Sequence, residues 1–99
     1  MKISVIIPCL NAADTIRDTL DALIEQSWPA DWEVIIADNG STDALGPVVA
    51  PFKTKIPSLR IIDAAAKRGA AYARNLAVKA ASGEGILFCD ADDVPGAGW

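Results

Sequence analysis

Residues 86–93 read Ile86-Leu87-Phe88-Cys89-Asp90-Ala91-Asp92-Asp93, an apolar run followed at once by an acidic cluster. A short apolar run of this kind predicts a buried strand of a parallel sheet. Carboxylates directly after such a strand would lie at its carboxyl end, where open α/β sheets bind their ligands. Carboxylate oxygens suit Mg²⁺ or Mn²⁺, and these ions in turn suit phosphates. The other interpretation of the cluster is a solvated acidic turn in which an Asp caps the next segment.

The rest of the chain alternates between strand patterns and helical patterns. We expect strands at residues 3–8, 33–37, 59–62 and 85–89, and Pro8 is expected to stop the first of them. Strands that alternate with helices form parallel βαβ units with right-handed crossovers. The sequence therefore predicts an α/β domain with the order βαβαβαβ.

Three helices are expected between these strands. They cover approximately residues 12–27, 43–49 and 69–81. In the first helix, apolar residues recur on one helical face, and Asn11 is expected to cap it. Residues 51–57 are expected to form a loop, and Gly83 is expected to end the third helix as a C-terminal glycine.

Composition limits the class of protein. The 99 residues, 52% of them hydrophobic, allow one globular domain with a modest core. The net charge of -4 argues against a nucleic-acid backbone as the main partner. The sequence contains no His, which excludes His-based zinc sites and Ser-His-Asp or Cys-His catalysis within this chain. With two Cys, no signal-peptide pattern and no apolar window of ~20 residues, we expect a cytoplasmic protein.

A second polar stretch, Asp38-Asn39-Gly40-Ser41-Thr42-Asp43, also follows an expected strand. A carboxylate at the position of Asp38 can accept hydrogen bonds from a nucleobase or a ribose. The stretch equally suits an Asx-turn that leads into a helix cap. Ser41 and Asp43 are interpreted as turn and cap residues rather than as catalysts.

Basic residues gather at the start of the third expected helix. A helix N-terminus that carries Lys67, Arg68 and Arg74 is a candidate anion site. A solvated basic face is the favoured interpretation of Lys67 or Arg68 taken singly. Arg74, within an Ala-rich segment, could instead hold the acidic turn in place as a structural ion pair. Cys9 is interpreted as a small buried residue rather than a nucleophile.

Together these motifs resemble the nucleotide-binding half of the family 2 glycosyltransferases, which have the GT-A fold. The family patterns are V-I-I-P-x-Y-N, E-I-I-V-V-D-D-G-S-T-D, N-x-G-x-x-x-A-R-N and G-E-x-I-x-F-L-D-A-D-D. The matching segments are residues 5–11, 33–43, 67–75 and 83–93, in the same order and at fitting spacing. The resemblance covers nearly the whole chain.

The resemblance implies a Rossmann-like parallel sheet with strand order 3-2-1-4 and helices on both faces. It implies a UDP-, GDP- or dTDP-sugar donor together with Mn²⁺ or Mg²⁺. Carried over residue by residue, Asp38 would meet the base, Asp90 the ribose or the metal, and Asp92 the metal that bridges the diphosphate. The full set of residues implied in nucleotide-sugar binding is Pro8, Leu10, Asn11, Asp38, Lys67, Arg74, Asp90 and Ala91.

Three departures from the family patterns bear on the site. Leu10 stands where the family often has Tyr, which weakens or removes base stacking. Asn39 replaces the second Asp of the family pattern, which leaves that carboxylate unassigned. Lys67 replaces the usual Asn and would add a diphosphate contact or nothing.

The resemblance also implies that residues 1–99 form only the donor half of a larger domain. The acceptor half, and the Asp or Glu base that inverting transfer to an acceptor hydroxyl needs, would lie beyond Trp99. No residue of this chain is assigned as catalytic, and we expect the chain to be inactive alone. The fourth strand, with Ile86, Leu87 and Phe88, would then form an exposed edge through which the chain self-associates.

Three other classes of protein were compared with the sequence. One alternative is a nucleotide- and metal-binding α/β module without turnover of its own. A signalling receiver domain fits poorly, because receivers place an acidic pair after the first strand, where this chain has Pro8-Cys9-Leu10-Asn11. A phosphatase with an Asp-x-Asp nucleophile fits poorly as well, since the motif here follows the fourth strand.

Overall fold

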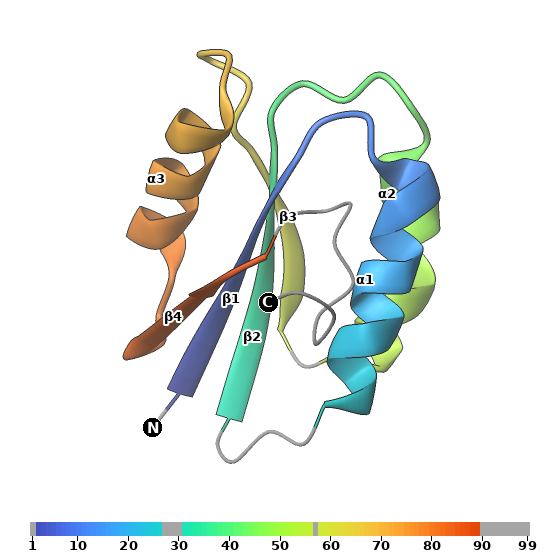
Figure 1. Cartoon of the computed structure of the whole chain (residues 1–99), viewed down its shortest axis with the longest axis vertical. Coiled ribbons are helices and arrows are strands. Elements are labelled where there is room, and N and C mark those ends of the chain that lie inside the picture. Colours follow the sequence, from blue (N-terminus) through green and yellow to red (C-terminus); the bar gives the residue numbers. More distant parts are fainter. Residues whose placement is uncertain (1, 27–30, 57, 90–99) are drawn as a thin grey trace.

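The computed structural model describes residues 2–26, 31–56 and 58–89. Four strands alternate with three helices, and a short 3₁₀ helix (η1) follows α2 (Figure 1). In chain order the elements are β1 (Lys2–Cys9), α1 (Ala13–Glu25), β2 (Asp31–Asp38), α2 (Leu45–Val49), η1 (Ala50–Thr54), β3 (Leu59–Asp63), α3 (Ala70–Ala80) and β4 (Gly85–Phe88).

The strands form one parallel sheet in the order β3-β2-β1-β4, which confirms the predicted topology. Figure 1 shows α3 on one face of the sheet and α1 with α2 on the other, so the prediction of helices on both faces is confirmed as well. Because every strand is parallel, all carboxyl ends lie along one edge of the sheet, where α/β folds bind ligands.

Two apolar clusters hold the layers together. On the face of α1 and α2, alternate strand residues such as Val5 and Ile36 pack against Leu20 and its helix neighbours. On the other face, the intervening residues, such as Ile35, pack against Ala73 and the other small residues of α3. Both faces of β1 and β2 are therefore buried, which explains why these strands are continuous apolar runs rather than alternating ones.

One expectation about the middle of the chain needs correction. Residues 51–57 were expected to form a loop, but they begin inside η1, which spans Ala50–Thr54. Phe52 is buried against the α1 face of the sheet, and that burial stabilises a compact turn in place of an open loop.

Pro8 does not stop β1, contrary to expectation. The carbonyl of Ile6 accepts a hydrogen bond of 2.9 Å from the N–H of Cys89, on the side of β4. Residues two apart in a strand point their polar groups the same way, so the nitrogen of Pro8 also faces the side of β4. Pro8 therefore has no N–H to donate on that side. The backbone groups of Cys9 face β2 instead. The carbonyl of Cys9 accepts a hydrogen bond of 2.9 Å from the N–H of Asn39 and so continues the ladder with β2.

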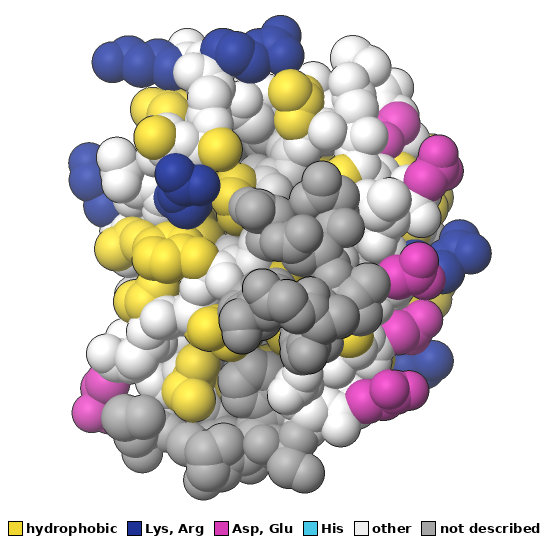
Figure 2. Space-filling view, viewed as in Figure 1, with side chains coloured by type: hydrophobic (Ala, Val, Ile, Leu, Met, Phe, Trp, Pro, Cys, Tyr) yellow, Lys and Arg dark blue, Asp and Glu magenta, His cyan; other side chains and the backbone are white. Residues whose placement is uncertain are grey.

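Strand β4 is less buried than its apolar sequence suggests. Ile86 is 39% exposed and Phe88 is 46% exposed. The reason is that α3 packs over β1 and β2, while β4 pairs with β1 alone among the described residues. Apolar side chains gather on this side of the molecule in Figure 2, over α3 and β4.

Gly83 does not end α3 in the expected manner. The helix ends at Ala80, and Ala81 is already extended, with φ -72° and ψ 141°. A Cβ on Gly83 would lie 2.4 Å from Oγ of Ser4 and 2.7 Å from its backbone nitrogen. Glycine is needed at this position because the connection to β4 passes directly against β1.

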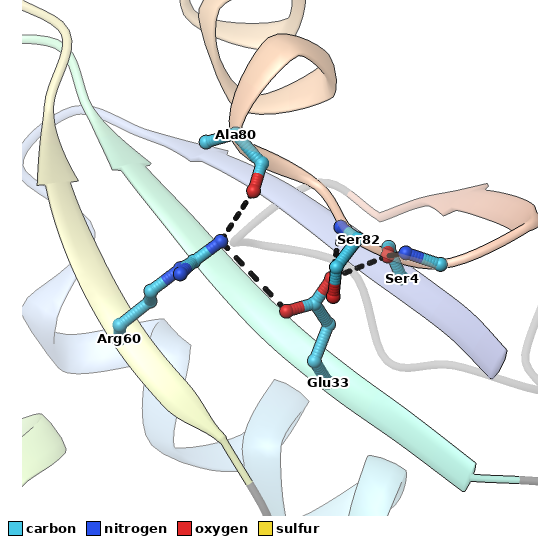
Figure 3. A network of polar contacts seen from close by, with 6 residues as sticks. Ser4, Glu33, Arg60, Ala80 and Ser82 are labelled. Carbon is cyan, nitrogen blue, oxygen red and sulfur yellow. Dashed lines mark hydrogen bonds and ion pairs between the residues drawn. The ribbon is translucent and has the colours of Figure 1, made fainter.

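A buried carboxylate fixes this same connection. Glu33 is 2% exposed and accepts hydrogen bonds from Oγ of Ser4 at 2.6 Å and from the N–H and Oγ of Ser82 at 2.8 and 3.0 Å. Arg60 lies 3.8 Å from the other oxygen of Glu33 and donates to the carbonyl of Ala80 (Figure 3). We call these residues the Glu33 clasp. They lie near the starts of β1 and β2, away from the carboxyl edge of the sheet.

Candidate functional site

Asn11 joins the two loops that follow β1 and β2. Its backbone lies in the left-handed region, with φ 51°. Its N–H donates to Oγ of Ser41 at 3.0 Å, and its Oδ1 accepts from the N–H of Thr42 at 2.8 Å. Asn11 therefore does not cap α1 as predicted, because its side chain is engaged with the neighbouring loop.

The cap of α1 comes from Asp43 instead. Position Ala12, which precedes the helix, offers no side-chain cap, and Oδ2 of Asp43 accepts a hydrogen bond of 2.9 Å from the N–H of Ala13. A carboxylate at a helix N-terminus satisfies an orphan donor and complements the helix dipole. Asp43 is a cap residue as predicted, but it caps the preceding helix rather than its own.

Asp38 adopts the Asx-turn that was one of its two interpretations. Its Oδ1 accepts hydrogen bonds from the N–H groups of Gly40 at 3.2 Å and Ser41 at 2.8 Å. The side chain is half-buried at the carboxyl end of β2, as expected. Both hydrogen bonds of the turn end on Oδ1. A contact between Asp38 and a nucleobase stays a prediction.

A cleft of about 710 Å³ opens at this edge of the sheet. One wall is the β1–α1 connection and the other is the start of α3. The lining residues are Pro8, Cys9, Leu10, Asn11, Ala12, Thr15, Asn39, Arg68, Gly69 and Ala70. Predicted binding residues Pro8, Leu10 and Asn11 are thus brought together on one wall.

The cleft also contains two residues outside the predicted set of nucleotide-sugar-binding residues, Arg68 and Asn39. Arg68 carries the charge in the lining; it was named with Lys67 and Arg74 as a candidate anion site, and taken singly it was assigned to a solvated basic face. Asn39 was considered only as a departure from the family pattern, and it is 5% exposed. An Asn just after an expected strand, where the family pattern has Asp, was the signal that could have identified it. Lys and Arg side chains stand out toward the top of Figure 2, the end of the molecule that holds the β3–α3 loop.

The other predicted binding residues are not in the described lining. The side chain of Lys67 is exposed, and Arg74 is half-buried on α3. Asp90, Ala91 and Asp92 lie outside the described residues, so the predicted metal ligands stay predictions. Within residues 2–26, 31–56 and 58–89, no group of three or more His, Cys, Asp or Glu could hold a metal ion.

Cys9 lies at the base of the cleft with a thiol that is hard to ionise. Burial raises the pKa of Cys9 above its ordinary value, and the nearby carboxylates of Asp38 and Asp43 raise it further. A neutral thiol is a poor nucleophile, in line with the interpretation of Cys9 as a small buried residue. Cys9 and Cys89 are both reduced and belong to the same buried cluster.

None of the described helices is long and apolar enough to cross a membrane.

Comparison with known proteins identifies the relatives of this chain. The family model described as "Glycosyl transferase family 2" matches residues 4–99. The poly(ribitol-phosphate) beta-glucosyltransferase of Bacillus spizizenii is 41% identical over 98 residues, which are 97% of this chain and 16% of that protein.

Solved structures agree with the sequence relatives. The crystal structure of S. aureus TarS 1-349 in complex with UDP superposes with a TM-score of 0.85 at 35% identity, covering 95% of this chain and 28% of that one. The mannosyltransferase PcManGT from Pyrobaculum calidifontis, in complex with GDP-Man and Mn²⁺, gives a TM-score of 0.82 at 34% identity, covering 93% of this chain and 28% of that one. The chain thus spans well under half the length of these relatives.

Proposed function

Because this chain belongs to glycosyl transferase family 2, we propose that residues 1–99 form the donor-binding half of a glycosyltransferase. The nucleotide-sugar donor binds in the cleft at the carboxyl edge of the sheet. The observation that carries this proposal is the cleft itself, which joins predicted binding residues at and just after the end of β1 to a cation just before α3.

The relatives support a nucleotide-sugar ligand. TarS has been solved with UDP and with UDP-GlcNAc, and PcManGT has been solved with GDP-Man. In this chain, Pro8 and Leu10 offer an apolar wall for the base, and Asp38 lies beside the cleft with one carboxylate oxygen engaged in its turn. Leu10 offers no aromatic ring, so the base is held by apolar contact and hydrogen bonds rather than by stacking on this residue.

We further propose that Mn²⁺ or Mg²⁺ is held by Asp90 and Asp92. The charge of the described cleft supports a metal, since its lining carries the single guanidinium of Arg68 and a diphosphate carries several negative charges. Carboxylate oxygens are the donors that these ions prefer. When bound, the metal neutralises the diphosphate as the leaving group. Arg68 and the N-terminal end of α3 provide the rest of the positive potential.

Transfer of the sugar is proposed to invert the anomeric centre and to use an acceptor hydroxyl. A base must take the proton of that hydroxyl. We assign that role to no residue of this chain, because we propose that residues 1–99 supply only the donor half. We expect no donor hydrolysis above background from this chain. Its cytoplasmic location stays a prediction.

The exposed side of β4 supports a proposal about association. Ile86 and Phe88 present apolar side chains on one face of β4, and Val78 of α3 is exposed as well. Among the described strands, β4 pairs on one side only, so its other side offers open backbone groups. We propose that the chain alone self-associates through this surface.

Calorimetry tests the donor site. UDP, GDP and dTDP are titrated into the chain in Mn²⁺ and again in EDTA, and one nucleotide is expected to bind with at least tenfold higher affinity in Mn²⁺. Absence of binding by all three nucleotides contradicts the proposed site. A non-catalytic nucleotide-binding module predicts the same binding, and it is separated from a transferase by assaying sugar transfer with a longer protein that contains these residues.

A further inference from the structure

The side chain of Asn39 is buried and fully engaged by one loop. Its Nδ2 donates to the carbonyls of Ala64 at 2.7 Å and Lys67 at 2.8 Å. Its Oδ1 accepts from the N–H of Gly69 at 2.9 Å. All of these partners belong to the connection between β3 and α3, and both hydrogens of the amide group are used. The identity of the atoms is fixed by the partners, because two carbonyl oxygens can only face a donor.

The loop that Asn39 holds forms one wall of the cleft. Gly69 precedes α3 with φ 127°, a conformation that side-chain-bearing residues rarely adopt. Gly69 and Arg68 both line the cleft. Three hydrogen bonds from one buried side chain therefore set where α3 begins and where the guanidinium of Arg68 is anchored.

We propose that Asn39 is a positioning residue of the donor cleft, whose amide holds the β3–α3 loop so that Arg68 and Gly69 meet the diphosphate of the nucleotide. This inference rests on the proposed function for its ligand, although the anchoring of the loop is independent of any ligand. Asn39 lines the cleft but need not contact the diphosphate itself.

The loop of this chain requires an amide at position 39, because two carbonyl oxygens face the side chain. An ionised Asp of the same shape has no hydrogen to donate and would place negative charge against the two carbonyl oxygens. A protonated Asp could restore one of the two donated bonds. Replacement of Asn39 by Asp therefore makes the position of the loop depend on pH. The native amide does not titrate and gives no such dependence.

The main experiment compares Asn39→Asp with the unsubstituted chain by ¹H–¹⁵N NMR and by nucleotide titration. In the native chain, the N–H of Gly69 is expected to be protected from hydrogen exchange. In Asn39→Asp at pH 8, that protection is lost and the affinity for the nucleoside diphosphate in Mn²⁺ falls at least tenfold. As the pH is lowered toward 5.5, the ratio of variant to native affinity rises again because the carboxyl group takes up its proton.

Ser4→Ala is the matched control. It removes a hydrogen bond from the Glu33 clasp and lowers stability at the other end of the sheet. It should leave nucleotide affinity unchanged, and its affinity relative to the native chain should not change with pH. Native protection of Gly69 and native affinity in Asn39→Asp at pH 8 would overturn the inference.

If Asn39→Asp does not fold, a second pair of variants tests whether the wall of the cleft that Asn39 holds contacts the nucleotide. Arg68→Ala changes an exposed side chain in the cleft lining, and Lys79→Ala changes an exposed side chain in the last turn of α3. Affinity that falls tenfold in Arg68→Ala alone supports the inference, and equal affinities overturn it. If the native chain binds no nucleotide, the proposed function fails, and exchange protection of Gly69 still tests whether Asn39 anchors the loop.

Discussion

Oδ2 of Asp43 accepts a hydrogen bond of 2.9 Å from the backbone N–H of Ala13, across 30 positions of sequence. A residue from the loop after β2 thereby caps the helix that follows β1. Asn11 makes the reciprocal connection by accepting from the N–H of Thr42. The two loops on one side of the cleft consequently behave as one unit, although each belongs to a different βαβ crossover.

Removal of this cap is expected to weaken the fold modestly. Asp43→Ala should lower the free energy of unfolding by about 1 kcal/mol, because the first turn of α1 loses its side-chain acceptor and a favourable charge. Chemical denaturation measures the change. Asp43→Asn keeps an acceptor and should lose less, and Asp21→Ala, on the exposed side of α1, serves as the control. Equal stability of the Asp43→Ala and Asp21→Ala variants would contradict the role of the cap.

The Glu33 clasp predicts a specific loss of stability in acid. Burial alone would raise the pKa of Glu33, but hydrogen bonds from Ser4 and Ser82 and the nearby charge of Lys2 hold it below its ordinary value of 4.5. The folded state therefore favours the ionised carboxylate. Its contribution is fully present above pH 4.5 and is lost as the pH falls through the lower pKa of the folded state.

Glu33→Gln tests this dependence. The substitution removes the negative charge and, if its remaining oxygen keeps the bonds from Ser4 and Ser82, turns two amide hydrogens toward Arg60, so the free energy of unfolding at pH 7 should fall by about 1–3 kcal/mol. The variant should also lose part of the change in stability between pH 5 and pH 3. Denaturation curves at several pH values measure both effects, and Glu84→Gln, at an exposed position, is the control. An unchanged acid profile in Glu33→Gln would show that other groups dominate it.

Two glycines offer a matched pair of substitutions. Gly83→Ala places a Cβ 2.4 Å from Oγ of Ser4 and should destabilise the fold by about 1–3 kcal/mol, since the backbone of β1 cannot move aside. Gly46→Ala lies in α2 with nothing within 4 Å of its new Cβ. It should be neutral or stabilising by up to about 1 kcal/mol. Thermal unfolding compares the two, and equal effects would refute the close approach of residue 83 to β1.

Binding experiments should distinguish the proposed contact with the metal ion from the proposed contact with the nucleobase. Asp92→Ala should remove most of the difference in nucleotide affinity between Mn²⁺ and EDTA, because it deletes a proposed metal ligand. Asp38→Ala should weaken binding in both conditions, since its proposed partner is the base. Calorimetric titration measures the nucleotide affinity of each variant in Mn²⁺ and in EDTA. An Asp92→Ala variant that retains the full metal effect would rule out this residue as a ligand.

The open side of β4 predicts concentration-dependent association. The chain should form dimers or larger species at high concentration, and Phe88→Lys should shift it toward monomer by placing a charge on the exposed face of β4. Light scattering after size separation reports the mass. Leu10→Lys, which changes an exposed apolar side chain in the loop after β1, controls for surface hydrophobicity. A native chain that stays monomeric at high concentration would refute the proposal.

The architecture of this protein was largely readable from local patterns. Runs such as residues 34–37 are apolar because both faces of the strand are covered, and their alternation with helical patterns specifies parallel crossovers. The order of the sheet and the helices on both faces followed from the resemblance and are confirmed. The acidic residues after β4 lie outside the described residues, so their role stays a prediction.

Individual polar residues were harder to interpret, because their partners lie far away in sequence. Asn11 was predicted to cap α1 and instead binds the next loop, 31 positions on. Gly83 was predicted to end a helix and instead makes room for Ser4, 79 positions away. Propensity and periodicity act over a few residues, whereas these roles exist only after parallel strands have brought separate loops together.

Asn39 illustrates the difference most directly. Its place after β2 was evident from the sequence, as was its departure from the family's second Asp. The reason for an amide there is not local, because its acceptors are the carbonyls of residues 64 and 67. Sequence patterns therefore determined which elements form and how they connect. Only the packed sheet decided which side chains meet at its carboxyl edge, since buried donors and acceptors choose partners by proximity in space.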